Sequence, residues 1–260
     1  MVRAININAD IAEGFGAWQI GNDAALTKLI KSASIACGFH AGDWNTMHRM
    51  CLLAREAGVS IGVHPGFNDL WGFGRRQIRM NPDDLERMVA YQIGALQAMA
   101  RYAGLPVTHL KPHGALNNMA AVEPEYALAI GRAIKVVDPT IIYVAQVGTE
   151  MEKAALELGL PLAREGFADR CYEEDLTLTP RSMPDAVHKD PAKVAAQVLR
   201  MVKDGEVVAR SGKVVKLTVD TICIHGDEPT GVAVATAVRQ ALDGAGIDVV
   251  TIPEMMRLRT

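Results

Sequence analysis

The stretch Ile35-Ala36-Cys37-Gly38-Phe39-His40-Ala41-Gly42-Asp43 starts as a short run of small apolar residues and breaks at a glycine. Such a run is typical of a buried strand, and glycine allows a tight turn or a close approach of the backbone to a ligand. The imidazole of His40 and the carboxylate of Asp43 suit proton transfer or metal binding. The pattern therefore predicts a buried strand that delivers functional side chains at its carboxyl end.

Three further histidines stand in the same setting. His64, His113 and His225 each come just after an apolar run and within two residues of a glycine, so four of the seven histidines share this placement. A lone histidine at a strand end is usually structural, whereas four in phase indicate one rim where strand ends bring imidazoles together. The three segments are 59–66, 107–114 and 217–227.

Strand patterns and helix patterns alternate along the whole chain, which predicts parallel βα units. Because the polar clusters lie at about seven strand ends, a closed ring fits them better than the single crevice of an open doubly wound sheet, which stays the alternative. We therefore predict one α/β domain over residues 1–260, built as a (β/α) barrel of about seven parallel strands. Besides the strand before Gly38, we expect strands at 4–8, 59–63, 107–111, 140–145, 160–164, 216–224 and 247–252, helices at 22–33, 44–57, 82–102, 123–136, 150–158, 191–204 and 229–244, and a hairpin within 205–215.

Length and composition are those of an ordinary globular protein. The 260 residues are 49% hydrophobic and 22% charged, and the formal net charge of −3 gives no electrostatic reason to expect nucleic-acid or membrane partners. The four cysteines are dispersed without a Cys-x-x-Cys pair, which argues against a disulfide framework. No signal-peptide pattern is present and no apolar run approaches the ~18 residues of a membrane span, so we expect a cytoplasmic protein.

The first strand ends in a cluster of polar side chains. A period of two places Asn6, Asn8 and Asp10 on one face, and Glu13 follows directly. Turn formation alone would explain the residues after Asp10, but not two asparagines inside a strand. We therefore interpret this face as functional.

A long loop follows the strand at 59–63 and mixes glycine, aromatic residues and two arginines. An arginine such as Arg76 could hold a carboxylate or phosphate, or could be an ordinary surface cation. The aromatic residues Phe67, Trp71 and Phe73 could form a surface for a partner protein, or instead a lid over the site or part of the core.

Acid–base candidates collect at the predicted strand ends. A histidine held by a carboxylate can relay protons near neutral pH, and nearby cations can stabilise an oxyanion or hold an anionic substrate. A mixed His/Asp site could instead bind a divalent metal, although the helical two-histidine signature with a glutamate is absent. The chain has no phosphate loop, dinucleotide-binding turn or nucleophile elbow. The acids and bases are Asp10, Glu13, His40, Asp43, His64, His113, Glu165, Asp169, His225 and Asp227, and the cations are Lys111, Arg76, Arg170 and Arg181.

Taken together, these clusters resemble the LamB/YcsF family nearly end to end, with several motifs in the right order. The first motif departs from the family pattern Asp-Leu-Asn-x-Asp-x-Gly-Glu-Gly, because Asn6 replaces the leading aspartate and Ala12 the glycine before Glu13. The shared motifs are Asn6-x-Asn8-x-Asp10-x-x-Glu13-Gly-Phe-Gly, Ala36-Cys-Gly-Phe-His-Ala-Gly-Asp43, His64-Pro-Gly, Phe73-Gly-Arg-Arg76, Lys111-Pro-His-Gly-Ala-Leu116, Glu165-Gly-Phe-Ala-Asp-Arg170 and His225-Gly-Asp227.

The resemblance implies a distorted (β/α) barrel similar to glycoside hydrolases and polysaccharide deacetylases. It also implies ATP-dependent opening of 5-oxo-L-proline to L-glutamate, with Mg²⁺ accompanying ATP, because the family supplies one component of a three-part 5-oxoprolinase. Subunits B and C (PxpB and PxpC) are the implied partners, and which subunit binds ATP stays open. On this interpretation the base is Asp10, His40 or His64, the oxyanion or phosphate lies near Lys111 and His113, and Asn8, Arg76, Arg170 and Arg181 bind the substrate.

Two other functions stay open at this point. One is a stand-alone metal-dependent hydrolase of the deacetylase kind, with a divalent metal in the barrel, acting on carbohydrates or amides. The other is a non-catalytic substrate-binding subunit. Self-association into a homo-oligomer is likewise left open.

Overall fold

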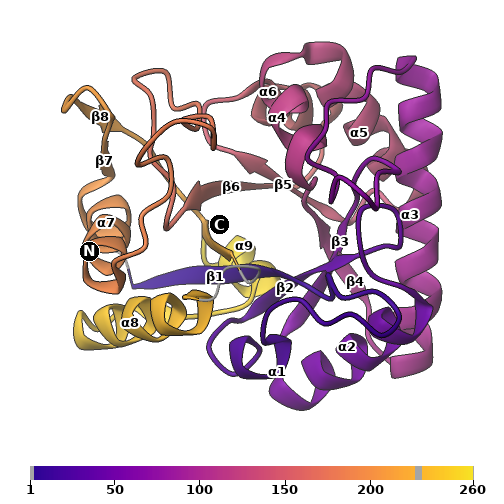
Figure 1. The fold of residues 1–260 in the computed structure, drawn as a ribbon, viewed down its shortest axis with the longest axis horizontal. Coiled ribbons are helices and arrows are strands. Elements are labelled where there is room, and N and C mark those ends of the chain that lie inside the picture. Colours follow the sequence, from indigo (N-terminus) through magenta and orange to yellow (C-terminus); the bar gives the residue numbers. More distant parts are fainter. Residues whose placement is uncertain (1–2, 226–229, 260) are drawn as a thin grey trace.

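Seven parallel strands form a closed ring in the computed structural model, which describes residues 3–225 and 230–259 (Figure 1). The last strand of the ring pairs back onto the first, with Asp10 opposite His225. This confirms the predicted barrel of about seven parallel strands and excludes the open sheet. The ring runs β1 (Ala4–Ile11), β2 (Ser32–Ala36), β3 (Ser60–His64), β4 (Val107–Leu110), β5 (Ile142–Gln146), β6 (Leu162–Phe167) and β9 (Thr221–His225).

Helices surround this ring, and several begin and end where the sequence predicts. Asn81 and Asp190 accept hydrogen bonds from the first-turn amides of their helices, and Gly58 and Gly104 end theirs in the left-handed conformation. The helices are α1 (Asp23–Leu26), α2 (Trp44–Ala57), α3 (Pro82–Ala103), α4 (Gly114–Val122), α5 (Pro124–Val137), α6 (Glu150–Leu158), α7 (Pro191–Asp204), α8 (Gly231–Gly244) and α9 (Ile252–Arg259). The predicted hairpin is β7 (Glu206–Val208) with β8 (Val214–Lys216), and β10 (Asp248–Val249) pairs with the start of β1.

Several elements differ from the prediction. The helix expected at 22–33 stops at Leu26, because the Lys31 amide donates to the Ile7 carbonyl at 3.0 Å as the chain enters β2. An additional helix, α4, precedes the one expected at 123–136 and begins at Gly114. The last strand has only two residues, and α9 follows it. In the first case pairing with a distant strand overrides a local helical pattern.

Alternate residues of each strand point into the barrel, and several of these inward residues are polar. Their side chains form hydrogen bonds with one another across neighbouring strands. Asn6 Nδ2 donates to the Ser32 hydroxyl at 2.8 Å, and Asn8 Nδ2 donates to the Thr221 hydroxyl at 2.7 Å. The predicted common face of Asn6, Asn8 and Asp10 is therefore the inner face of the barrel.

Helix α9 closes the amino-terminal end of the barrel. Its first residue, Ile252, packs against Ile142, Val144 and Ala163, and its amide donates to the Ser32 hydroxyl at 3.1 Å. With this end occupied, the functional groups are left to the carboxyl ends of the strands, as is usual in βα barrels.

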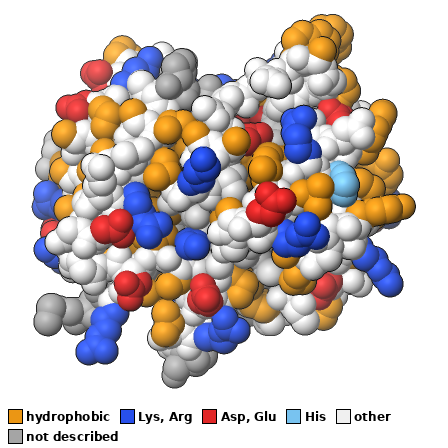
Figure 2. Space-filling model, turned by 90° about the horizontal axis from the view of Figure 1, so that it is seen from below, with side chains coloured by type: hydrophobic (Ala, Val, Ile, Leu, Met, Phe, Trp, Pro, Cys, Tyr) orange, Lys and Arg blue, Asp and Glu red, His pale blue; other side chains and the backbone are white. Residues whose placement is uncertain are grey.

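The outer surface carries mixed charges. Figure 2 shows one face, on which basic and acidic side chains are interspersed with apolar ones. Among the described residues, no helix combines the length and the apolar character needed to cross a membrane.

Replacing Gly62 by alanine should destabilise the protein. Gly62 lies on β3, and an added Cβ would overlap the imidazole of His109 inside the barrel. Overpacking of this kind reduces the free energy of unfolding by about 1–3 kcal/mol. Urea unfolding measures the effect, and Gly94→Ala is the control, because Gly94 is an exposed position of α3 where a Cβ meets open space. The control should gain up to about 1 kcal/mol, and equal effects of the two substitutions would contradict this packing.

The protein should lose stability in mild acid partly through His109. Burial, reinforced by the charge of Lys111, lowers the pKa of His109 from its ordinary 6.5 to about 3. As the pH falls below 6.5, His109 becomes protonated in the unfolded chain but stays neutral in the folded chain. The free energy of unfolding therefore decreases towards pH 3. Between about pH 7 and about pH 5 this amounts to about 2 kcal/mol. Urea unfolding at both pH values measures this decrease in the free energy of unfolding. The decrease should be smaller by that amount in His109→Gln than in the wild type, and equal decreases in the two proteins would contradict the assignment.

Candidate active site

The ammonium group of Lys111 lies buried inside the barrel, just past the end of β4. Its Nζ is 2.6 Å from Asp10 Oδ1 on β1 and 3.2 Å from Glu165 Oε1 on β6. It also donates to Asn8 Oδ1 at 3.0 Å and to Cys223 Sγ at 3.0 Å. The four partners come from three strands, so the ion pairs span the interior.

Burial and pairing act in opposite directions on these three charges. Burial opposes the charge of Asp10, but His64 and Lys111 outweigh it and hold the pKa of Asp10 well below its usual value. Burial likewise opposes the charge of Lys111, yet Asp10, Cys223 and Glu165 raise its pKa well above normal. Burial dominates at Glu165 and raises its pKa, in spite of Lys111. Asp10 and Lys111 are thus a persistent ion pair, and Glu165 is the carboxyl group that protonates more readily.

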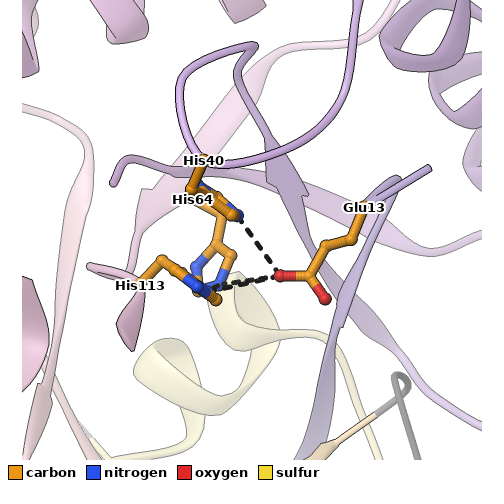
Figure 3. A group of neighbouring side chains, drawn as sticks. All are labelled: Glu13, His40, His64 and His113. Carbon is orange, nitrogen blue, oxygen red and sulfur yellow. Dashed lines mark hydrogen bonds and ion pairs between the residues drawn. The ribbon is translucent and has the colours of Figure 1, made fainter. Parts of the chain in front are cut away.

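A second group, the histidine–glutamate cluster, consists of Glu13, His40, His64 and His113 (Figure 3). Its members come from the ends of four consecutive strands, β1 to β4, and all are buried. Glu13 Oε1 is 3.2 Å from His40 Nε2, 3.3 Å from His113 Nδ1 and 3.9 Å from His64 Nε2. His64 Nε2 and His113 Nδ1 are 3.0 Å apart. Three of the four predicted strand-end histidines therefore meet at one carboxylate.

Backbone carbonyl groups orient two of these rings. His64 Nδ1 lies 2.8 Å from the Lys111 carbonyl oxygen, and His113 Nε2 lies 2.8 Å from the Phe73 carbonyl oxygen. Because a carbonyl oxygen can only accept, each of these nitrogens carries a hydrogen. Burial, followed by the nearby imidazoles, lowers the pKa of His40 and that of His113 well below the usual value. The His40 and His113 rings are therefore neutral at physiological pH, and they stack with their centroids 3.7 Å apart.

The fourth strand-end histidine, His225, pairs with a different carboxylate. Its Nδ1 lies 2.8 Å and 3.0 Å from the two oxygens of Asp169. Burial opposes the charge of Asp169, but His225 outweighs it and lowers the pKa of Asp169. The Nδ1–H bond leaves Nε2 of His225 as the nitrogen that can accept a proton.

A cavity of about 520 Å³ opens over Asp10, Lys111, His113 and His225. Other buried side chains, such as Phe167 and Arg170, also line it, and the lining includes more exposed cations as well. Such a polar, cation-lined cavity suits a small anionic ligand. Its lining includes Asp10, Lys111, His113, His225, Phe167, Arg170, Arg75 and Arg181.

Several predicted site residues have other contacts. Asp43 caps α2, accepting from the Asn45, Thr46 and Gly16 amides, so it is a structural group at the rim. Arg76 pairs with Asp69 and its side chain is 66% exposed; among the described residues, the cavity lining includes its neighbour Arg75 instead.

Arg170 lines the cavity but also holds the chain around it. Its Nη2 donates to the Thr179 carbonyl at 2.6 Å and its Nε donates to the Ala186 carbonyl at 3.3 Å. Burial, together with the charge of Arg181, lowers the pKa of Arg170 to about 10. Asp227 lies outside the described residues, so its predicted role stays a prediction.

The loop at 67–76 divides its three aromatic residues among three environments. Phe67 is part of the core, Phe73 packs edge-on against His40 and His113, and Trp71 is 95% exposed. One loop thus provides both the expected cover over the site and an exposed ring.

Several lining residues were not among the predicted site residues, and Arg75 and Gln146 are two of them. Gln146 ends β5, and its Nε2 donates to the Leu176 carbonyl at 2.9 Å. A polar residue directly after the apolar run at 140–145 was the available signal. For Arg75 the signal was its place beside Arg76 in the same motif.

The departure at Ala12 coincides with a tight backbone turn. Ala12 has φ of 62°, a left-handed conformation that favours glycine, and it follows the last residue of β1. The turn directs Glu13 towards the histidines. Glycine, the usual residue of the LamB/YcsF pattern here, would adopt this conformation without strain.

Known proteins resemble this chain in both sequence and fold. The LamB/YcsF family pattern matches residues 5–257. A protein of Rhodopseudomonas palustris, named as the A subunit of 5-oxoprolinase, is 54% identical over 249 residues, covering 95% of this chain and 98% of its own length. The crystal structure of a lactam utilization protein from Thermus thermophilus is 43% identical, with a TM-score of 0.91, and covers 95% of this chain and 99% of its own.

A more distant structure shares the fold alone. The peptidoglycan deacetylase PdaC from Bacillus subtilis is 11% identical, with a TM-score of 0.51 over 99% of this chain and 93% of its own. This agrees with the predicted likeness to deacetylase barrels. The family match and the close relatives together show that the chain belongs to the LamB/YcsF family.

Proposed function

We propose that this chain is the lactam-binding subunit of an ATP-dependent 5-oxoprolinase and opens 5-oxo-L-proline to L-glutamate with subunits B and C. The name of its close relatives, which identifies them as a 5-oxoprolinase subunit, supports the assignment. The observation that carries it is the buried Lys111–Asp10 pair on the wall of a cavity that also contains a carboxylate-held histidine, His225. A cation beside a proton acceptor is what hydrolysis of an amide requires.

The cavity fits a small anion with a carbonyl group. Arg75 and Arg181 line its more exposed part, where they would attract the carboxylate of 5-oxoproline. Lys111 would face the lactam carbonyl and stabilise the negative charge that develops on its oxygen. The volume of about 520 Å³ exceeds that of a five-membered lactam and leaves room for a phosphoryl group.

Resonance makes the lactam a poor electrophile, and its ring closes again readily. ATP, bound with Mg²⁺, would transfer a phosphoryl group to the amide oxygen and leave as ADP, and this transfer makes the ring carbonyl carbon more electrophilic. His225 would then take a proton from the attacking water through Nε2, while Asp169 holds the ring through Nδ1 and stabilises the imidazolium. Cleavage of the ring C–N bond, with the proton held by His225 passing to the leaving nitrogen, would give γ-glutamyl phosphate. A second water would hydrolyse this acyl phosphate to glutamate and inorganic phosphate.

The histidine–glutamate cluster and the deacetylase-like fold favour one other function, a metal-dependent amide hydrolase. Such an enzyme would release its product without ATP, whereas a non-catalytic binding protein would release none with any partner. Glutamate release from 5-oxoproline, measured with and without ATP and partners, separates the three.

We expect the chain alone to show little 5-oxoprolinase activity and to gain it when mixed with subunits B and C. Trp71, 95% exposed on the loop that covers the site, is the candidate contact for a partner. Trp71→Ala should weaken assembly by about tenfold or more, because exposed tryptophans are frequent interface anchors. Sedimentation of the mixed subunits measures assembly, and a coupled glutamate assay measures activity.

Tyr102→Ala is the matched control for this experiment. Tyr102 is 80% exposed but lies near the end of α3, at the amino-terminal side of the barrel. It should assemble normally. Full activity of the chain without partners would contradict the partner requirement. Normal assembly of Trp71→Ala would show that the loop at 67–76 is not part of the interface.

Asp169→Asn should reduce kcat of the assembled enzyme by about 10²–10⁴-fold with little change in KM, since the amide cannot stabilise the His225 imidazolium. Single-turnover release of glutamate measures the step, and thermal melting checks that the variant is folded. Asp204→Asn, an exposed position at the end of α7, is the control and should retain activity. A folded Asp169→Asn variant with the normal rate would show that this pair is not the base.

A further inference from the structure

We propose that Glu13, His40, His64 and His113 bind one divalent transition-metal ion of the zinc class, through three imidazole nitrogens and one carboxylate oxygen. The proposal goes beyond the proposed 5-oxoprolinase function, which gives these residues no metal, and it holds whether or not that function is correct. Figure 3 shows the three imidazoles arranged around the Glu13 carboxylate.

The spacing of the donor atoms fits such an ion. One donor atom from each residue lies within 4.8 Å of all the others. The distances between neighbouring donors are 3.2 Å, 3.3 Å, 3.9 Å and 3.0 Å. Donors at the corners of a tetrahedron around zinc, with bonds of about 2.0–2.1 Å, lie about 3.3–3.4 Å apart. These four separations are therefore close to those of a tetrahedral zinc site, and the stacked rings of His40 and His113 would tilt apart so that both nitrogens point at one ion.

The hydrogen-bonding pattern also favours a cation. His64 uses its Nδ1–H, and His113 its Nε2–H, to donate to backbone carbonyl groups. In the neutral rings the inner nitrogens, His64 Nε2 and His113 Nδ1, therefore carry lone pairs, and they face each other at 3.0 Å. The Glu13 carboxylate adds a third acceptor at 3.3 Å from His113 Nδ1. Acceptors this close repel one another unless a positive charge lies among them.

A single proton does not satisfy all these contacts. A proton on His64 Nε2 would bond to His113 Nδ1 or to Asp10 Oδ2, which is 3.3 Å away. Glu13 Oε1 would still face the lone pair of His113 Nδ1 at 3.3 Å. One dication at the centre contacts every acceptor at once, and neutral imidazoles are the form that ligates metals.

The surroundings hold the rings as metal-binding histidines are usually held. Histidine ligands typically donate their outer N–H to a carbonyl or carboxylate, as His64 and His113 do here. The ring of Phe73 covers His40 and His113 edge-on, which limits the access of water. A dication here would also lie next to Asp10, and through it next to Lys111.

The test is metal binding by the purified full-length chain. After removal of metal with a chelator, titration with Zn²⁺ by calorimetry should give one site per chain. Co²⁺ should give the intense visible bands of tetrahedral coordination, without the near-ultraviolet absorption of a thiolate ligand. Either ion should raise the melting temperature, and chelator should reverse the rise. Absence of saturable binding at one equivalent by the wild-type chain would overturn the proposal without reference to any variant.

Variants locate the ion. His64→Gln and His113→Gln should each weaken Zn²⁺ binding by about 100-fold or more and abolish the tetrahedral Co²⁺ spectrum. Cys223→Ser is the matched control, because Cys223 belongs to the other candidate group, with Asp10 and His225. His48→Gln controls for binding by a partly exposed histidine of α2. Both controls should bind Zn²⁺ with an affinity within about twofold of that of the wild-type chain. Loss of the site in Cys223→Ser, or its persistence in both cluster variants, would place the ion elsewhere.

Discussion

The ion pairs of Lys111 hold the centre of this barrel together. A buried ammonium group is tolerated only where partners replace its hydration, and here Asp10 lies at 2.6 Å and Glu165 at 3.2 Å. The three residues come from β4, β1 and β6, and neither β1 nor β6 is a neighbour of β4 in the ring. The pairs therefore cross the interior and fix strands that have no backbone contact. Removing one partner would leave a buried charge uncompensated, which couples the integrity of the site to the stability of the fold.

Asp10 connects this lysine to two histidine centres. Its Oδ1 contacts Lys111, its Oδ2 lies 3.3 Å from His64, and it groups with His225 on the other side. Buried charges are screened little by salt, so a change of charge at either histidine centre acts on the same ion pair. The proposed proton transfer at His225 and the proposed metal ion at the histidine–glutamate cluster would both affect the lysine that faces the substrate.

The loop between β3 and α3 shows how one segment can serve several purposes. Its Phe73 carbonyl accepts from His113, and the Phe73 ring packs on two imidazoles, so the loop encloses the cluster. The pairing of Arg76 with Asp69 holds its shape. Trp71, between these anchors, is left in solvent. An exposed tryptophan on a well-anchored loop is consistent with a contact surface beside the cavity.

Much of this could be predicted from local patterns, because they act over a few residues. The alternation of strands and helices, the caps at Asn81 and Asp190, and the common face of Asn6, Asn8 and Asp10 depend on periodicity and on side-chain hydrogen bonds to nearby amides. The placement of histidines at strand ends could be expected in the same way. Which carboxylate each histidine meets was beyond such patterns, since Glu13 and His113, or Asp169 and His225, come together only when the ring closes. The same holds for Asp43 and Arg76, whose residue types suit chemistry but whose partners in the folded chain are helix amides and Asp69. Residue type and spacing specify which groups reach the rim, while packing across the barrel specifies their partners, and with them their charge.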